Sequence, residues 1–193
     1  MAMGLTEQVA QFVGIPAMYA KQLLDICRHK QLAKGEFFIA AGQYPKKMAI
    51  VLSGLFRYLY VDDEGNEYTK AFMPEGSFLS SYSAMILNER SYYSIEALEN
   101  AEILEFSYEN WQILKDSDVV WKDLLIGLLE QGYGAKERRE RELLLLDAET
   151  RYRNFCKERP TLIARVKQHQ IASFLGIKPE SLSRLKKNMT DLT

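Results

Sequence analysis

Cysteine and histidine are scarce in this chain of 193 residues, which has only two of each. Cys27 and Cys156 are too few for a disulfide scaffold and too far apart in sequence for a zinc knuckle. An iron–sulfur cluster would take about four cysteines. His29 and His169 stand among Lys, Arg and Gln, with no cluster of Asp, Glu or Cys around them. We therefore expect neither a metal site nor acid–base catalysis at these residues.

Long apolar runs are also missing, since none approaches the ~18 residues that a membrane-spanning helix needs. The opening stretch MAMGLTEQVAQFVG lacks the basic start and apolar core of a signal peptide, so the expected location is the cytosol. No nucleophile has an adjacent base and no glycine-rich phosphate loop occurs, so we expect a protein that is not an enzyme. With 47% hydrophobic and 26% charged residues, the composition is that of a soluble globular protein.

The composition and spacing of apolar residues change near Gly35. Before it, apolar residues recur at helical spacing and are interrupted at Gly14 and Pro16, which predicts one or two short helices. After it, glycines separate short runs that are rich in Ile, Val, Phe, Tyr and Thr. This spacing predicts antiparallel strands of a sandwich or barrel across residues 35 to 107.

Two turns are expected within this sheet region. Asp63-Glu64-Gly65-Asn66 supplies turn residues between two β-prone arms, which predicts a hairpin. A second strand pair fits SYYSIEALENAEILEFS, with Glu99-Asn100 at its turn.

A long helix is predicted after Ser107. Its apolar residues include a stripe at helical spacing, which must find a partner. Gly127, Gly132 and Gly134 each cost roughly 1 kcal/mol against Ala in a helix interior. They either allow a second helix to approach closely or mark a kink. The alternating charges of residues 136–142 predict a solvated face.

The stretch QIASFLGIKPESLSRLKK, residues 170–187, has the spacing of a helix-turn-helix. Ile171 and Leu175 share a helix face, and Gly176 can adopt the positive φ that ends a helix. Pro179 fits the first turn of a second helix, whose leucines point back toward the first. Ala172 is small where the two helices would cross. An ordinary helical hairpin with a solvated basic face is the alternative.

The charge of this segment indicates its partner. From residue 165 to 187 there are six Lys or Arg against one Glu, although the chain as a whole has a net charge of −1. The free face of the second helix carries Glu180, Ser183, Arg184 and Lys187. Our hypothesis is that Arg184 donates to guanine and Glu180 accepts from cytosine in a major groove. The residues expected to hold phosphates are Lys178, Ser181 and Lys187.

The order of these elements resembles the bacterial Crp/Fnr family of transcription regulators. The resemblance rests on KGEFFIAAGQ, on VLSGLFRYLYVDDEGNEYTKAFMPEGSF, on IEALENAEIL and above all on residues 170–187. It implies an α+β fold: a cyclic-nucleotide-binding-like antiparallel β jelly roll over 1–115, a dimerisation helix over 116–146 and a helix-turn-helix domain over 147–193. It also implies a homodimer on a two-fold operator, with an interface at Val120, Leu124, Leu128 and Ala135.

The effector is the point at which this sequence departs from the family. Relatives that bind cyclic AMP have a Gly-Glu pair for the ribose and an Arg-Ser-Ala stretch for the phosphate. Here Ser77 replaces the carboxylate, and Tyr92 replaces the small residue and is expected to fill nucleotide space. We expect a different effector, or none, rather than cyclic AMP. The resemblance places the effector site at Gly76, Ser77, Phe78, Arg90 and Ser91.

The partners expected are double-stranded DNA and a second copy of the chain, with RNA polymerase as a further candidate. The β-hairpin wing that usually follows the recognition helix is not expected, since only NMTDLT follows Lys187. The alternative function is a nucleotide-binding regulatory subunit that uses residues 165–187 to dock a partner protein. Salt dependence separates the two, because DNA binding weakens steeply with salt.

Overall fold

The computed structural model describes residues 4–190, apart from the side chains of residues 189 and 190. The chain divides into two compact units. The β unit comprises Met1–Val61 and Lys70–Lys122, and the helical unit comprises Asp62–Thr69 and Asp123–Thr193. The short segment 62–69 therefore belongs to the helical unit, although its neighbours on both sides belong to the β unit.

The β unit begins with two short helices, α1 (Leu5–Val13) and α2 (Ala17–Asp25), as the sequence predicts. Gly14 ends α1 in the left-handed region, with φ at 74°, and its N–H donates to the Ala10 carbonyl. The other elements, in chain order, are β1 (Arg28–Leu32), β2 (Phe37–Ile39), β3 (Lys47–Ser53), β4 (Phe56–Val61), β5 (Glu67–Met73), β6 (Phe78–Leu79), α3 (Tyr82–Leu87), β7 (Ser94–Ala97), β8 (Ala101–Ser107) and α4 (Tyr108–Ser117).

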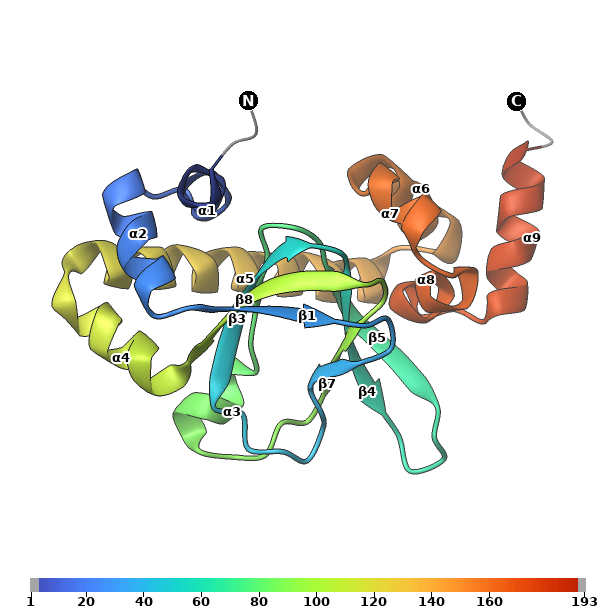
Figure 1. Ribbon diagram of the computed structural model, residues 1–193. Coiled ribbons are helices and arrows are strands. Elements are labelled where there is room, and N and C mark those ends of the chain that lie inside the picture. The colour runs from blue at the N-terminus through green and yellow to red at the C-terminus, as the bar shows by residue number, and fades with distance from the viewer. Residues whose placement is uncertain (1–3, 191–193) are drawn as a thin grey trace. The chain divides into compact units, whose positions relative to one another are not determined.

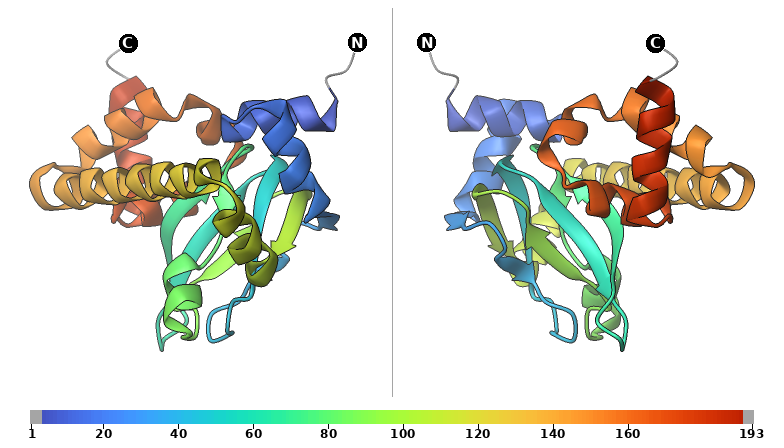
Figure 2. Two further views of the ribbon diagram at one scale, coloured as in Figure 1. Left: turned by 90° about the vertical axis from the view of Figure 1, so that its left-hand side faces the viewer. Right: turned by 90° about the vertical axis from the view of Figure 1, so that its right-hand side faces the viewer.

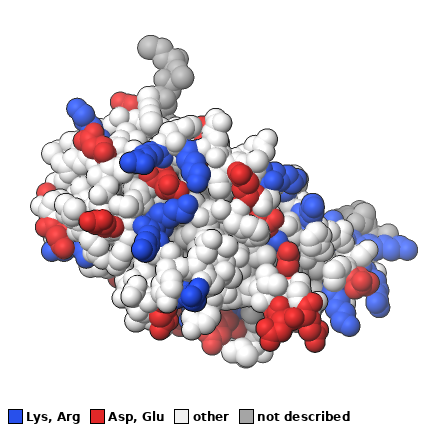
Figure 3. Space-filling model, turned by 60° about the horizontal axis from the view of Figure 1, so that its bottom comes forward, with Lys and Arg blue, Asp and Glu red and all other residues white. Residues whose placement is uncertain are grey.

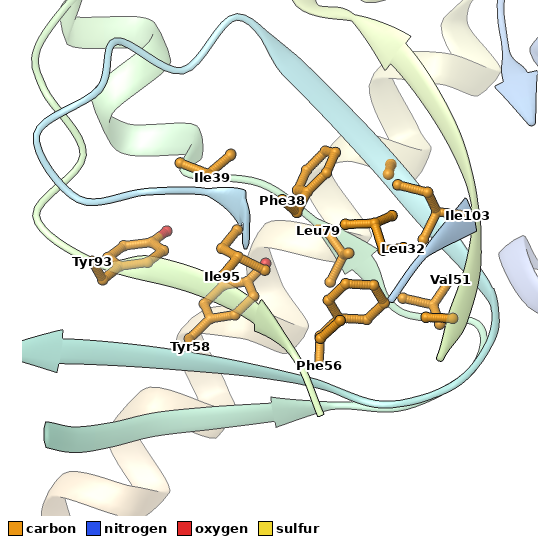
Figure 4. Packing of buried hydrophobic residues seen from close by; sticks show 13 residues of the cluster. Leu32, Phe38, Ile39, Val51, Phe56, Tyr58, Leu79, Tyr93, Ile95 and Ile103 are labelled. Carbon is orange, nitrogen blue, oxygen red and sulfur yellow. The ribbon is translucent and has the colours of Figure 1, made fainter. Parts of the chain in front are cut away.

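The strands form two four-stranded antiparallel sheets in a jelly roll (Figure 1). One sheet has the order β1-β8-β3-β6 and the other β2-β7-β4-β5. Their inner faces supply the core shown in Figure 4, where Phe56, Leu79, Ile95 and Ile103 are fully buried. Burying each such side chain contributes roughly 1.5–3 kcal/mol. The mixed fold expected from the sequence is thus confirmed.

The predicted turn at residues 63–66 is confirmed, and Asp62 organises it. The Asp62 carboxylate accepts from the backbone N–H groups of Glu64 and Asn66 at 3.0 and 2.8 Å. The Asn66 side-chain amide also donates to this carboxylate at 3.0 Å, and it is the main reason, with the two backbone hydrogen bonds, why the pKa of Asp62 lies below its usual value. Gly65 takes the positive φ, 85°, that the turn requires.

Two expectations for the sheets were wrong. Strands β7 and β8 do flank Glu99 and Asn100, but they lie in different sheets and do not pair as a hairpin. Strand β1 lies in a stretch that was expected to be helical. Its polar sequence RHKQL contains no helix breaker, but it forms an exposed edge where His29 and Lys30 meet Glu102 and Glu105 of β8.

The helical unit contains most of α5 (Val119–Leu145), followed by α6 (Ala148–Glu158), α7 (Pro160–Arg165), α8 (Gln168–Leu175) and α9 (Pro179–Thr190). Helix α5 continues through Gly127, Gly132 and Gly134 without a break (Figure 2). A Cβ atom at any of these glycines would meet no atom within 4 Å. The Asp147 side chain caps α6 by accepting from the Thr150 N–H at 2.8 Å. No strand follows β8 in the described part of the chain.

Candidate functional site

Gly176 makes the tight turn between α8 and α9. It ends α8 in the left-handed conformation, with φ at 66°, and its N–H donates to the Ser173 carbonyl at 3.1 Å. The next N–H, of Ile177, reaches back to the Ala172 carbonyl at 3.0 Å. This backbone arrangement closes the helix end and redirects the chain into Pro179, the first residue of α9.

The apolar residues that the sequence pattern singled out hold the two helices together. Ala172 and Leu182 are fully buried, and Ile171 and Leu175 are nearly so. Ala172 leaves room for the second helix, because a larger side chain would stand between the two backbones. The local signals for a helix-turn-helix, which were glycine, proline, a small residue and anchors, are all present in the folded chain.

Helix α9 turns its polar face to solvent. Glu180, Ser183, Arg184 and Lys187 are exposed, and their spacing of three and four places them on one face of the helix. Lys178 is also exposed, just before the helix begins, whereas Ser181 is half-buried. The Lys178 carbonyl accepts from the N–H groups of Ser181 and Leu182, which fixes the first turn.

Gly76, Ser77 and Phe78 are anchored through their backbones in the β unit. The Gly76 N–H donates to the Val51 carbonyl at 2.9 Å, and the Ser77 carbonyl accepts from the Val51 N–H at 3.0 Å. Gly76 has φ at 78°, and a Cβ there would touch the Phe12 ring at 3.4 Å. The Phe78 carbonyl accepts from the Tyr58 hydroxyl at 3.4 Å.

Arg90 and Ser91, which follow α3, differ in where their side chains go. Arg90 is exposed, donates to the Gly42 carbonyl at 2.7 Å and lies 5.0 Å from the Tyr44 ring centroid. Ser91 is buried, and its hydroxyl lies 2.7 Å from the Tyr93 carbonyl oxygen and 2.9 Å from Ser81 Oγ. The Ser91 hydroxyl is therefore engaged within the protein, while Arg90 remains at the surface.

A cluster of tyrosines, which the sequence reasoning missed, lies beside these residues. Tyr58 and Tyr93 stack with ring centroids 5.2 Å apart, and Tyr60 meets Tyr93 edge-on at 5.9 Å. The Lys70 ammonium sits 3.9 Å from the Tyr93 ring centroid. Burial raises the pKa of Tyr93, so its hydroxyl stays protonated and donates to the Ser80 carbonyl.

The expectation that Tyr92 would fill nucleotide space was wrong. Tyr92 is 77% exposed, whereas its neighbour Tyr93 is only 8% exposed and takes the interior position. Both tyrosines lie in the bend that precedes β7, so strand alternation does not indicate which of them faces inward.

Metal and membrane signals are absent from residues 4–190, the part of the chain that the structure describes. Among these residues, no three His, Cys, Asp or Glu side chains are placed to hold a metal ion together. None of the helices described there is both long and apolar enough to cross a membrane. Acidic and basic side chains are interspersed over the face that Figure 3 presents.

The comparison with known protein families points to the β unit. Residues 29–118 match the family model of the cyclic nucleotide-binding domain. No curated protein matches the chain.

Solved structures extend the likeness over most of the chain. The c-di-GMP responsive global regulator CLP of Xanthomonas campestris has a TM-score of 0.75 at 18% identity, covering 91% of this chain and 92% of that one. FixK2 of Bradyrhizobium japonicum has a TM-score of 0.76 at 17% identity, covering 86% of each chain. A Crp/Fnr-family protein of Eubacterium rectale has a TM-score of 0.73 at 15% identity, covering 95% of this chain and 88% of that one. The chain thus combines a match to the cyclic nucleotide-binding domain with the fold of Crp/Fnr regulators, in agreement with the sequence resemblance.

Proposed function

We propose that this protein is a homodimeric transcription regulator that reads a two-fold DNA site with helix α9. The observation that carries the proposal is the α8–α9 pair, which is closed by Gly176 and buries Leu182 while leaving the face of Arg184 exposed. In a helix-turn-helix, the second helix enters the major groove and contacts base edges with its N-terminal half. The fold shared with Crp/Fnr regulators supports the same reading.

Each exposed group of α9 suits a particular contact with DNA. Arg184 can donate two hydrogen bonds to O6 and N7 of guanine, and Glu180 can accept from N4 of cytosine one helical turn away. Lys178 and Lys187 flank this face and can neutralise backbone phosphates. Ser181 is half-buried and its N–H donates to the Lys178 carbonyl, but its hydroxyl lies in the first turn of α9, where an anion is favoured.

Helix α5 supports the dimer through an exposed apolar stripe. Ile126, Leu129 and Tyr133 are 52%, 47% and 70% exposed, and spacings of three and four place them on one face. The residues predicted from the sequence, Val120, Leu124, Leu128 and Ala135, lie about half a turn away, and the first three are already half-buried within the chain. We therefore place the stripe at the centre of the dimer interface.

The jelly roll is proposed as the sensor, by its match to the cyclic nucleotide-binding domain. Arg90 is the residue best able to reach a phosphate, since its guanidinium is exposed. Ser77 provides no carboxylate for a ribose, and Tyr58 and Tyr93 are packed into the core beside it. We propose an effector other than cyclic AMP. CLP of Xanthomonas campestris, a c-di-GMP responsive protein, makes a cyclic dinucleotide the first alternative to test.

The DNA-binding proposal is tested by selecting an operator from random duplexes with the purified protein. Affinity for the selected site is then measured across a salt series for the wild type, Arg184→Ala and Arg153→Ala. Arg153 is exposed on α6 and pairs with Glu149, so its loss removes the same charge away from the proposed groove face. We expect Arg184→Ala to cost about 1–3 kcal/mol and to relax the preference at one base pair, with Arg153→Ala close to wild type.

Two results would contradict the proposal. One is failure to enrich any two-fold site. The other is unchanged affinity and unchanged base preference in Arg184→Ala. Tight binding to a partner protein with little salt dependence would instead favour the regulatory-subunit function.

The sensor is tested separately by isothermal titration with cyclic AMP and with cyclic di-GMP, using Arg90→Ala as the control. Saturable heat with cyclic di-GMP that is lost in Arg90→Ala would support the sensor assignment. Micromolar binding of cyclic AMP would show that Ser77 is tolerated and would overturn the choice of effector.

A further inference from the structure

A small cavity of about 50 Å³ lies within the helical unit, between the C-terminal half of α5, helix α6 and the end of α8. Its lining is rich in arginine, with Arg138 and Arg139 from α5, Arg151 from α6 and Arg159 from the α6–α7 junction. None of these arginines belongs to the exposed face of α9. The cavity is therefore distinct from the surface proposed to bind DNA.

Two of the guanidinium groups share one aromatic ring. The Arg139 guanidinium lies 4.0 Å from the centroid of Phe174, and that of Arg159 lies 5.0 Å from the same centroid. A guanidinium over a ring face is held in position, while its N–H groups, which lie in the guanidinium plane, can still donate at its edge. Arg139 uses Nη2 in this way, donating to the Thr69 carbonyl at 3.4 Å. The ring thus holds two planar donors close together at the cavity wall.

Arg151 adds a third donor to this wall. Its Nη1 donates to the Leu146 carbonyl at 2.8 Å, which anchors the side chain at the end of α5. Its Nε is buried and has no hydrogen-bond partner in the protein. Burying a charged N–H without an acceptor costs free energy, so this group favours the binding of an anion.

The carboxylates of the lining do not balance these cations. Glu158 lies 3.9 Å from Arg138, and Glu142 accepts from the Asn154 side chain at 3.3 Å. Four arginines against these two glutamates leave the lining with two excess positive charges. Burial and then the neighbouring charge of Arg159 lower the pKa of Arg139 to about 10, although the charge of Glu142 acts in the opposite direction.

We propose that this cavity is a binding site for a small tetrahedral oxyanion of the phosphate class, held by Arg139, Arg151 and Arg159. Guanidinium groups bind phosphate oxygens with paired, charge-assisted hydrogen bonds, and a dianion matches the excess charge of the lining. One water needs about 10–15 Å³ of such a space, so the cavity has room for an ion with about four oxygens. Bound there, the ion would join α5 to α6 and to the α6–α7 junction. This inference does not depend on DNA binding.

The test is isothermal titration of the full chain with inorganic phosphate. The ionic strength is kept constant by lowering the chloride concentration as phosphate is added. Constant ionic strength matters because phosphate at high concentration stabilises folded proteins without a site. We expect saturable binding of one phosphate per chain, accompanied by a rise in Tm that levels off at the same concentrations. Glucose 6-phosphate is titrated in parallel, and tighter binding than that of inorganic phosphate would identify the ligand as a phosphate ester rather than the free ion.

Matched variants locate the site. Arg139→Gln and Arg159→Gln should each weaken phosphate binding at least about tenfold, because each removes a charged pair of donors. Arg153→Gln, which removes an exposed arginine of α6 outside the lining, should leave it unchanged. Cooperative thermal unfolding of each variant confirms that it is folded.

A readout on the wild type keeps the proposal testable if the variants do not fold. In ¹⁵N-labelled protein, the Nε–Hε signal of Arg151 should shift on addition of phosphate. The absence of saturable phosphate binding to the wild type would overturn the proposal. Equal binding by the wild type, Arg139→Gln and Arg159→Gln would overturn it as well.

Discussion

Arg57 and Glu96 stand directly opposite each other on β4 and β7, and the Arg57 guanidinium donates to one Glu96 oxygen at 2.6 and 3.1 Å. The Arg57 side chain is 3% exposed and that of Glu96 is 19% exposed. The pair is therefore largely removed from water.

Replacing Glu96 alone should be strongly destabilising, since it leaves the Arg57 charge buried without its carboxylate. We expect Glu96→Leu to lower the free energy of unfolding by about 3–5 kcal/mol. Arg57→Met combined with Glu96→Leu should recover much of that loss. Denaturant unfolding of the wild type, both single variants and the double variant measures the coupling. Purely additive effects would contradict the prediction.

Gly54 is the glycine at which a side chain meets the strongest obstacle. Its φ is 95°, and an added Cβ would lie 2.7 Å from Ala101 Cβ and 2.9 Å from Ala101 Cα. Gly65, with φ at 85° and no atom within 4 Å, is the matched control for backbone strain alone. We expect Gly65→Ala to cost about 1–2 kcal/mol and Gly54→Ala about 2–5 kcal/mol. Chemical denaturation measures both losses of stability. Equal losses for the two variants would show that a Cβ at residue 54 fits beside Ala101 of β8 without a clash.

The exposed stripe on α5 predicts how the dimer can be broken. The double variant Ile126→Glu/Tyr133→Glu places two charges on this stripe and should shift the protein to a monomer at micromolar concentration. Sedimentation velocity measures the shift. Ile163→Glu, on the surface of α7, is the control and should remain dimeric. A double variant that stays dimeric would move the interface to another face of α5.

Cys27, which follows α2, should be a poor nucleophile in the folded chain. Burial raises the pKa of its thiol to about 12. At pH 8 the thiolate fraction is then only roughly one in 10,000, against about a quarter for a thiol with the ordinary value. Iodoacetamide labelling followed by mass spectrometry should be far slower in the native protein than in urea. Equal rates in the two conditions would refute the predicted shift.

The raised pKa of Cys27 also determines how the free energy of unfolding changes with pH. Because the folded state holds the thiol proton more tightly, the unfolded chain ionises first. Stability is unaffected below the unfolded pKa of about 8.5 and is lost as pH rises from there toward 12. Cys27→Ser should unfold with a weaker pH dependence over this range.

Local chemistry explains which features the sequence predicted. The turn at Gly65 and the helix end at Gly176 depend on residues within a few positions of each other, so their signals are contiguous in the chain. The anchors Ala172 and Leu182 follow from helical spacing alone.

Features that depend on distant residues were not predictable in this way. Strand β8 pairs with β1 and β3 rather than with the adjacent β7, a choice that the packing of two whole sheets determines. The buried position of Tyr93 likewise depends on distant residues, because its ring stacks on Tyr58 and its hydroxyl donates to the Ser80 carbonyl. The arginines around Phe174 come from separate helices, and nothing in their sequence spacing indicates a common cavity.

The segment 62–69 has a consequence for how this chain can be divided or recombined. The Ser173 hydroxyl of α8 donates to the Glu67 carbonyl at 3.0 Å and accepts from the Thr69 N–H at 2.8 Å, so the helical unit includes a piece of chain from far upstream. A gene fragment that begins at α5 would encode helices without these backbone partners. Exchange of modules with a related regulator would have to carry the tip of the β4–β5 hairpin together with α8, even though more than a hundred codons separate Glu67 from Ser173.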